Sequence, residues 1–122
     1  MSSGVAEVTS IECGQDIAGS LAGKYFLIYD ESGSVEVWFK IAFGSGSAPG
    51  VANRAIQVTV FTDDGATTVA ECLRTELEAD GAWSIAIRNS NVVTLTDAHD
   101  GQRTDAADVN TGFSISVTTQ GA

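Results

Sequence analysis

The stretch 25–41 constrains the fold of this chain more than any other part of the sequence. Two runs rich in aromatic and β-branched residues, 25–29 and 35–41, flank the polar segment 30–34, which has the length of a hairpin loop. In the second run, the odd-numbered residues are apolar and the even-numbered residues form the other face, which is the period of a half-buried strand. The first run is apolar on both faces, as in a central strand. We therefore expect a β-hairpin on which the other elements pack.

Length and charge exclude several classes of protein. The chain has 122 residues, enough for one domain, with 16 acidic and 6 basic residues and a net charge of -10. An acidic surface repels phosphate groups, so we expect no nucleic-acid partner. The sequence has neither a signal peptide nor an apolar run of the ~20 residues that a membrane span needs, which predicts synthesis in a cytosol-like compartment and no membrane contact. Cys13 and Cys72 are expected to be reduced there, although a disulfide remains an alternative.

Alternating apolar residues predict strands outside the first hairpin as well. These segments are 5–11, 54–62, 83–88, 92–96 and 113–118. The turn Asn89-Ser90-Asn91 joins two of them into a second hairpin. Segment 97–112 is polar and has no apolar period, so we expect a long connection there.

One segment, about Thr68 to Ala79, has the period of a helix. Thr68 and Glu71 have the spacing of a capping box, and Gly81 stands where a helix C-cap glycine belongs. The sequence therefore predicts an α+β fold, a mainly antiparallel β-sheet or small sandwich of six to seven strands with one amphipathic helix packed on it. We expect residues 1–22 to form an N-terminal arm or a short strand plus a connection, and residues 23–122 to form a single β-rich structural domain.

Residue types suited to catalysis are present, but no catalytic spacing accompanies them. The single histidine, His99, lies in an acidic segment. Ser84, Ser90 and Cys72 qualify as nucleophiles only by residue type, because no family motif surrounds them. We therefore expect no enzymatic activity and no cofactor.

Segment 97–108 is rich in aspartate and raises the question of a cation site. Its acidic residues are Asp97, Asp100, Asp105 and Asp108. Carboxylates on loops bind Ca²⁺, but the spacing is not that of an EF-hand and the terminal glutamate is missing. Clustered acids are usually a solvated surface, so we expect no metal and keep a cation at this segment as the alternative. The sequence Asp63-Asp64-Gly65 is explained by a turn that leads into the helix.

Several short motifs, taken in order, resemble a small module of structural proteins in tailed bacteriophages. They are Gly23-Lys24-Tyr25-Phe26-Leu27, Val37-Trp38-Phe39, Pro49-Gly50, Ile56-Gln57-Val58, and Val69-Ala70 opening a helix that reaches Leu77. The resemblance extends from Gly23 to Thr118, and its tyrosine-phenylalanine and valine-tryptophan-phenylalanine pairs are the most distinctive part. It implies a virion component, supplies no catalytic residues, and leaves the location in the virion open.

Within that class, the first expectation is a capsid decoration, or cement, protein on the capsid exterior, made in the host cytoplasm. Its partner would be the major capsid protein, and lattice symmetry favours a homo-oligomer such as a trimer. The residues expected at the partner interface are Val5, Val8, Ile11, Trp38 and Pro49. The alternative is a tail or fibre-associated module that contacts host-surface carbohydrate through Trp38. A small enzyme is the third and most remote reading.

Overall fold

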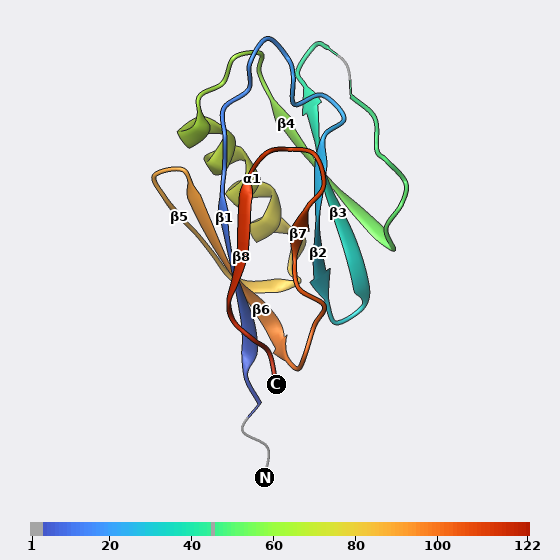
Figure 1. Cartoon of the computed structure of the whole chain (residues 1–122), viewed down its shortest axis with the longest axis vertical. Coiled ribbons are helices and arrows are strands. Elements are labelled where there is room, and N and C mark those ends of the chain that lie inside the picture. Colours follow the sequence, from blue (N-terminus) through green and yellow to red (C-terminus); the bar gives the residue numbers. More distant parts are fainter. Residues whose placement is uncertain (1–3, 45) are drawn as a thin grey trace.

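Two four-stranded sheets and one helix make up the computed structural model, which describes residues 4–44 and 46–122 (Figure 1). The predicted α+β class and the small sandwich are confirmed, with eight strands instead of the expected six to seven. Most strand pairs are antiparallel, and the one exception joins β3 to β4. Phe26 and Phe39 of one sheet pack with Phe113, which precedes the last strand of the other, with ring centroids 6.2 and 5.5 Å from that of Phe113. The apolar core therefore fills the space between the sheets.

The first sheet has the order β4-β3-β2-β7 and contains the predicted hairpin. Its strands are β2 (Tyr25–Asp30), β3 (Gly33–Ile41), β4 (Arg54–Val60) and β7 (Ala107–Asp108). The hairpin turn is shorter than predicted, because the Asp30 carboxylate accepts the N–H groups of Ser32 and Gly33 at 2.7 and 3.1 Å and closes the turn early. Strand β4 runs parallel to β3, since the connection between them returns the chain to the start of β3.

The second sheet has the order β5-β6-β1-β8. Its strands are β1 (Ala6–Glu12), β5 (Trp83–Asn89), β6 (Val92–Asp100) and β8 (Ser114–Thr119). The segment before residue 23 thus supplies an inner strand, which lies between β6 and β8. The prediction of one long connection over 97–112 is wrong, because β6 continues to Asp100 and β7 forms within that segment. The end of β6 pairs with β1, and β7 pairs with β2. These pairings form strands in a segment whose sequence has no apolar period.

Strand β3 is buried on both faces, which corrects the predicted half-buried strand. On its outer face, Glu36 and Trp38 are only 1% and 8% exposed. The connection to β4 crosses this face, and Glu36 accepts three of its backbone N–H groups at 2.7–2.9 Å. At Gly46 the connection passes so close to β3 that a Cβ atom would lie 2.9 Å from the carbonyl oxygen of Phe39. A glycine is therefore required where the chain crosses.

The helix α1 (Ala66–Asp80) packs against β4 and β5 and so bridges one edge of each sheet (Figure 1). Its buried stripe consists of Val69, Ala70, Leu73 and Leu77, as the sequence period predicts. The predicted capping box is wrong, because the helix begins earlier, with Gly65 as N-cap and without a side-chain cap. The predicted C-cap is confirmed, since Gly81 has the left-handed φ of 84°.

Candidate interaction surface at the apex

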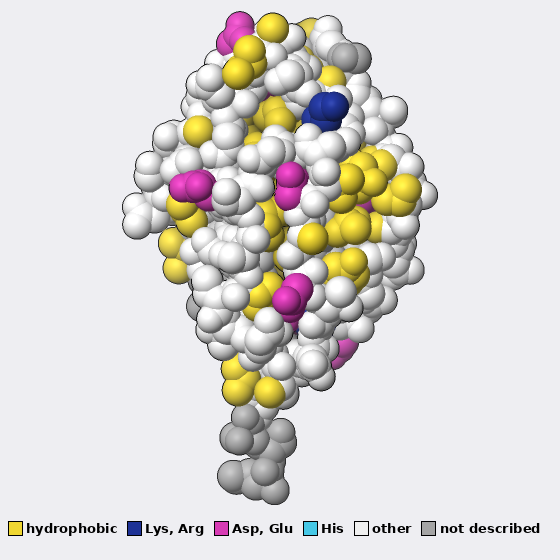
Figure 2. Space-filling model, viewed as in Figure 1, with side chains coloured by type: hydrophobic (Ala, Val, Ile, Leu, Met, Phe, Trp, Pro, Cys, Tyr) yellow, Lys and Arg dark blue, Asp and Glu magenta, His cyan; other side chains and the backbone are white. Residues whose placement is uncertain are grey.

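Three loops meet at the end of the sandwich opposite the chain termini (Figure 1). They are residues 13–24, 42–44 and 61–65, and we call this end the apex. Each loop carries one large apolar side chain that is exposed to solvent: Ile17 is 61% exposed, Phe43 is 101% exposed and Phe61 is 58% exposed. The two phenylalanine rings lie beside each other, with centroids 6.2 Å apart. Apolar and acidic side chains are both visible at this end in Figure 2.

The backbone of the apex holds unfavourable conformations. Ala18, Phe43 and Asp63 have φ values of 52°, 60° and 64°, in the left-handed region that favours glycine. One such residue costs about 1–2 kcal/mol when it carries a Cβ atom, and the surrounding structure must hold it in place. The remaining non-glycine residue of this kind among those described is Ser90, in the β5–β6 turn. Backbone strain is thus concentrated where the apolar side chains are exposed.

A buried carboxylate holds two of the apex loops together. Asp16 is 2% exposed and accepts backbone N–H groups from Gly19, Leu21 and Asp63 at 2.8, 2.9 and 2.8 Å. Burial raises the pKa of Asp16, but these three donors outweigh it and leave the pKa below its ordinary value. The side chain is therefore a charged crosslink between loop 13–24 and loop 61–65.

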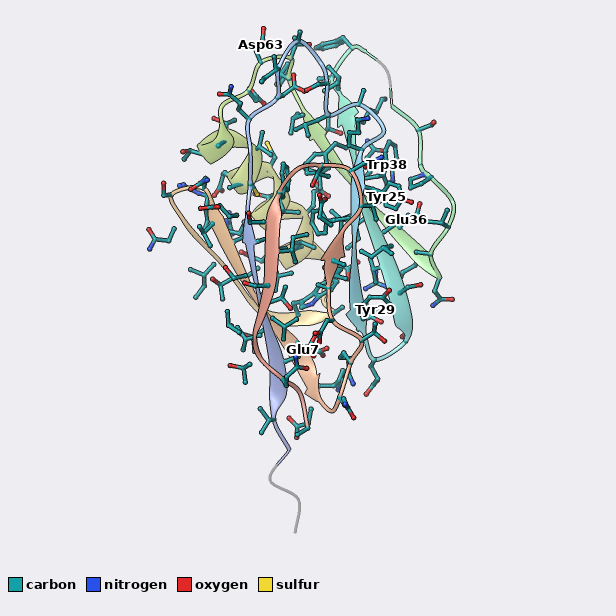
Figure 3. All side chains as sticks on the ribbon, viewed as in Figure 1. Glu7, Tyr25, Tyr29, Glu36, Trp38 and Asp63 are labelled. Carbon is teal, nitrogen blue, oxygen red and sulfur yellow. The ribbon has the colours of Figure 1, made fainter. Side chains whose placement is uncertain are left out.

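Two further aspartates complete this crosslink. Asp63, at the top of Figure 3, accepts the N–H of Ala18 at 2.6 Å, and Asp64 accepts the N–H of Phe61 at 2.8 Å. The N–H of Asp16 donates to the carbonyl oxygen of Asp64 at 2.9 Å. The loop that carries Phe43 is joined to the end of β4, because the N–H of Ala42 donates to the carbonyl oxygen of Val60 at 2.7 Å. The apolar side chains therefore project from a fixed frame with an acidic rim.

Such a frame suits the binding of another macromolecule. Exposed apolar side chains gathered at one place mark interaction sites more often than single ones do. Rigid loops lose little conformational entropy on binding, so more of the contact energy appears as affinity. The acidic rim favours a partner whose apolar pocket is surrounded by basic groups.

The residues that the sequence predicted at a partner interface lie outside the apex loops. Ile11 is 0% exposed and Trp38 lies under the β3–β4 connection, so both are packed inside the chain. Val8 and Pro49 are half-buried. Val5 is exposed, but it lies near the termini, where its N–H donates to the carbonyl oxygen of Ala122 at 2.8 Å. The structure therefore does not bring these five residues into one surface.

The nucleophile and histidine candidates are also separated. Ser90 lies in the turn before β6 and His99 lies near the far end of that strand, whose rise from Val92 to His99 is about 23 Å. His99 is instead 3.6 Å from Glu31 of the β2–β3 turn. Burial raises the pKa of the Cys72 thiol and raises that of Cys13 to about 12, so neither thiol is activated. The side chain of Ser84 lies outside the described residues.

The aspartate-rich segment 97–108, for which a cation is the alternative expectation, is engaged in other contacts. Asp97 is buried and pairs with Arg103 at 3.0 Å, while Asp108 accepts the N–H groups of Thr111 and Gly112 at 3.1 and 3.0 Å. Across residues 4–44 and 46–122, no three histidine, cysteine or acidic side chains form a group suited to a metal ion. The same residues contain no helix that is long and apolar enough to cross a membrane.

Comparison with protein families, with curated proteins and with solved structures gave no match to this chain.

The apex residues escaped the sequence analysis because their convergence depends on the fold. Ile17, Phe43 and Phe61 are far apart in the chain and follow no common period. The available signal was local: Ile17 and Phe43 each stand next to glycine, aspartate or alanine in a connecting segment, where large apolar residues are uncommon.

Proposed function

We propose that this chain is a structural protein of a bacteriophage virion that decorates the capsid and binds the shell through the apex. The main support for this binding mode is that Ile17, Phe43 and Phe61 are exposed on apex loops. These loops contain residues with left-handed φ values, and hydrogen bonds of Asp16 join two of the loops. The virion assignment rests on the sequence resemblance over Gly23 to Thr118. The major capsid protein would be the partner, with this chain on the capsid exterior.

The energetics of such binding follow from the apex side chains. Burying one large apolar side chain contributes about 1.5–3 kcal/mol relative to leaving it in water. A ligand that binds the assembled shell but not its free subunits shifts the equilibrium toward assembly, and many bound copies multiply the effect. The net charge of -10 favours a shell surface with basic groups and keeps the free protein soluble.

The alternative location, in the tail or a fibre, involves carbohydrate contact through Trp38, and the burial of this residue disfavours that contact. Contact with carbohydrate through Trp38 requires an exposed ring face, whereas Trp38 is 8% exposed beneath the connection. Tyr25 and Tyr29 lie along the same side of the molecule and are half-buried (Figure 3). A tail location without Trp38 stacking is kept as an outcome of the experiment.

The first test is the number of copies of this chain per purified particle, measured by quantitative mass spectrometry against the major shell protein. A fixed, simple ratio to the shell protein supports capsid decoration. A few to a few dozen copies per particle contradict decoration and favour the tail or fibre. Absence from purified particles overturns the virion assignment.

The second test concerns the apex and uses particles that lack the chain. We expect the double variant Phe43→Ser and Phe61→Ser to lose about tenfold or more in affinity for these particles, because two exposed anchors are removed. Ile87→Ser is the control, since Ile87 is also exposed but lies on β5, outside the apex. Equal affinities for the two variants would contradict docking through the apex.

A further inference from the structure

Strand β4 is an edge strand with a regular backbone. It pairs only with β3, and the pairing runs without a shift from Arg54 to Val60. Within the described chain, the N–H and C=O groups on its other side have no strand partner. A straight edge of this kind is a template to which another extended segment can add.

The usual protection of an edge strand is absent from β4. Its sequence, Arg54 to Val60, contains no proline and no lysine. The exposed residues Ala55, Gln57 and Thr59 are uncharged. The single charge belongs to Arg54, whose guanidinium pairs with Asp30 at 2.5 Å and Asp80 at 2.6 Å, so it does not repel an incoming strand.

The free edge of β4 opens onto a groove beside α1. This groove has a volume of about 300 Å³ and is lined by Ala55, Ile56, Gln57, Glu76, Ala79 and Asp80. The two alanines, one on each wall, leave room for side chains of a bound segment. A strand edge next to a helix offers backbone hydrogen bonds on one side and side-chain contacts on the other.

The charges of the groove select the occupant. Asp80 pairs with Arg54, which it shares with Asp30, whereas Glu76 is exposed and has no ion-pair partner in the described part of the chain. A second copy of this chain would place another Glu76 and a net charge of -10 against the first. A segment with basic side chains removes this repulsion and pairs with Glu76.

We propose that the groove between β4 and α1 binds an extended, basic segment of a partner protein, which adds a strand to the free edge of β4 and places a lysine or arginine opposite Glu76. This surface is separate from the apex and does not depend on the virion assignment. It gives the chain a second, backbone-directed contact with the same or another partner.

The test is an NMR titration of the whole ¹⁵N-labelled chain with a capped peptide of alternating valine and lysine, of the same length as β4. We expect saturable shifts of the amides of 55–59 and 76–80, and much weaker binding of a matched valine–glutamate peptide. Two further peptides carry N-methyl groups on alternate residues, one on the odd-numbered and the other on the even-numbered residues. Only every second N–H group of an added strand points toward β4. The peptide in which these N–H groups are methylated should lose binding, and the other peptide should keep it.

Variants of α1 separate the groove from other sites. Ala79→Arg fills the groove and is expected to weaken binding by about tenfold or more. Thr68→Arg introduces the same side chain at an exposed position in the first turn of α1 and should leave the affinity nearly unchanged. Glu76→Lys should reverse the preference toward the valine–glutamate peptide. The proposal is overturned if no peptide binds, if the shifts lie along β5 or β8, or if both N-methylated peptides bind equally. None of these outcomes affects the copy-number test of the virion assignment.

Discussion

The two sheets of this sandwich are built differently. In the first sheet, the pairings of β3 with β2 and β4 run without interruption. In the second sheet, the register shifts where β1 meets β6, where β1 meets β8 and where β5 meets β6. Both sheets bury polar side chains, although the inner face of β3 is entirely apolar. In the first sheet these are Asp30 and Glu36, whose carboxylates accept backbone N–H groups. In the second sheet they are Glu7, Thr9 and Asp97.

This difference indicates where the stability of the fold resides. Apolar packing on an uninterrupted ladder is strongly stabilising, and each buried polar group reduces the gain unless it is fully hydrogen-bonded. The Oε1 atom of Glu7 is buried and has no hydrogen-bond partner. We therefore expect the first sheet and α1 to carry most of the free energy of unfolding.

The largest expected effect is the loss of a core side chain from the first sheet. Phe39 is fully buried on β3 and packs against Phe113, so Phe39→Ala should lower the free energy of unfolding by about 3–5 kcal/mol. Ile115→Ala on β8, where the side chain is partly buried, should cost about 1–2 kcal/mol. Urea unfolding measures both, and similar losses would contradict the unequal contribution of the two sheets.

A smaller loss is expected at the outer face of β3. Glu36→Gln replaces one acceptor oxygen by an amide donor that faces the N–H of Gly50, Val51 or Ala52, so about 2 kcal/mol of unfolding free energy should be lost at neutral pH.

This loss should depend on pH. Burial raises the pKa of Glu36, but the three N–H donors outweigh it and lower the pKa below its ordinary value. The stabilisation is therefore present above the pKa of the unfolded chain and is lost as pH falls through the folded value. Urea unfolding at neutral pH and at about pH 3 should show a smaller difference between wild type and variant in acid. A difference independent of pH would mean that packing, not charge, holds the connection.

A gain of stability is expected in the second sheet. Burial and the charges of Asp105 and Asp97 raise the pKa of Glu7, against the opposing N–H of Gly121 and the charge of Arg103. The favourable contribution of protonated Glu7 is present below its unfolded pKa and lost as pH rises through the folded value. At neutral pH, Glu7→Gln should therefore raise the free energy of unfolding by about 1 kcal/mol.

The control for this gain is Glu12→Gln, at an exposed position of the same strand. Thermal unfolding at neutral pH should show an increase for the Glu7 variant alone. If the Glu7 variant is less stable than wild type, the unpartnered carboxylate is not a weak point of the second sheet.

The smallest expected effect lies at the apex, where strain accompanies exposure. Phe43→Asn places a residue that tolerates positive φ at a position with φ of 60°, so the free energy of unfolding should rise by about 0.5–1 kcal/mol. Phe61→Asn removes the same kind of exposed ring where the backbone is not left-handed, and should give no gain. Equal effects of the two variants would show that φ at Phe43 stores no strain.

The sequence predicts those parts of the fold whose signals are local. The apolar alternation of β4 and the helical period of α1 lie within single segments, and both elements appear close to the expected residues. The burial of Trp38 could not be predicted in the same way, because it depends on a connection that has no period of its own. Strand β7 consists of one small and one polar residue and exists only because they pair with β2. Such a tertiary contact leaves no pattern in the local sequence.

The candidate site was harder to predict than the fold. The sequence predicts the turn Asp63-Asp64-Gly65 before the helix, but the hydrogen bond from the N–H of Ala18 to Asp63 joins residues 45 positions apart. A single sequence carries no signal for such a contact, nor for the full exposure of the Phe43 side chain.

The pairing of the two chain ends has a mechanical consequence. Val5 and Ala122 exchange hydrogen bonds of 2.8 and 3.0 Å where the antiparallel strands β1 and β8 begin and end (Figure 1). A force that pulls these ends apart acts across the strands and breaks their hydrogen bonds one after another, as in a zipper, instead of loading all of them together. Tension applied through the termini should therefore open the β1–β8 seam at low force. Attachment through the apex would keep that load away from the seam.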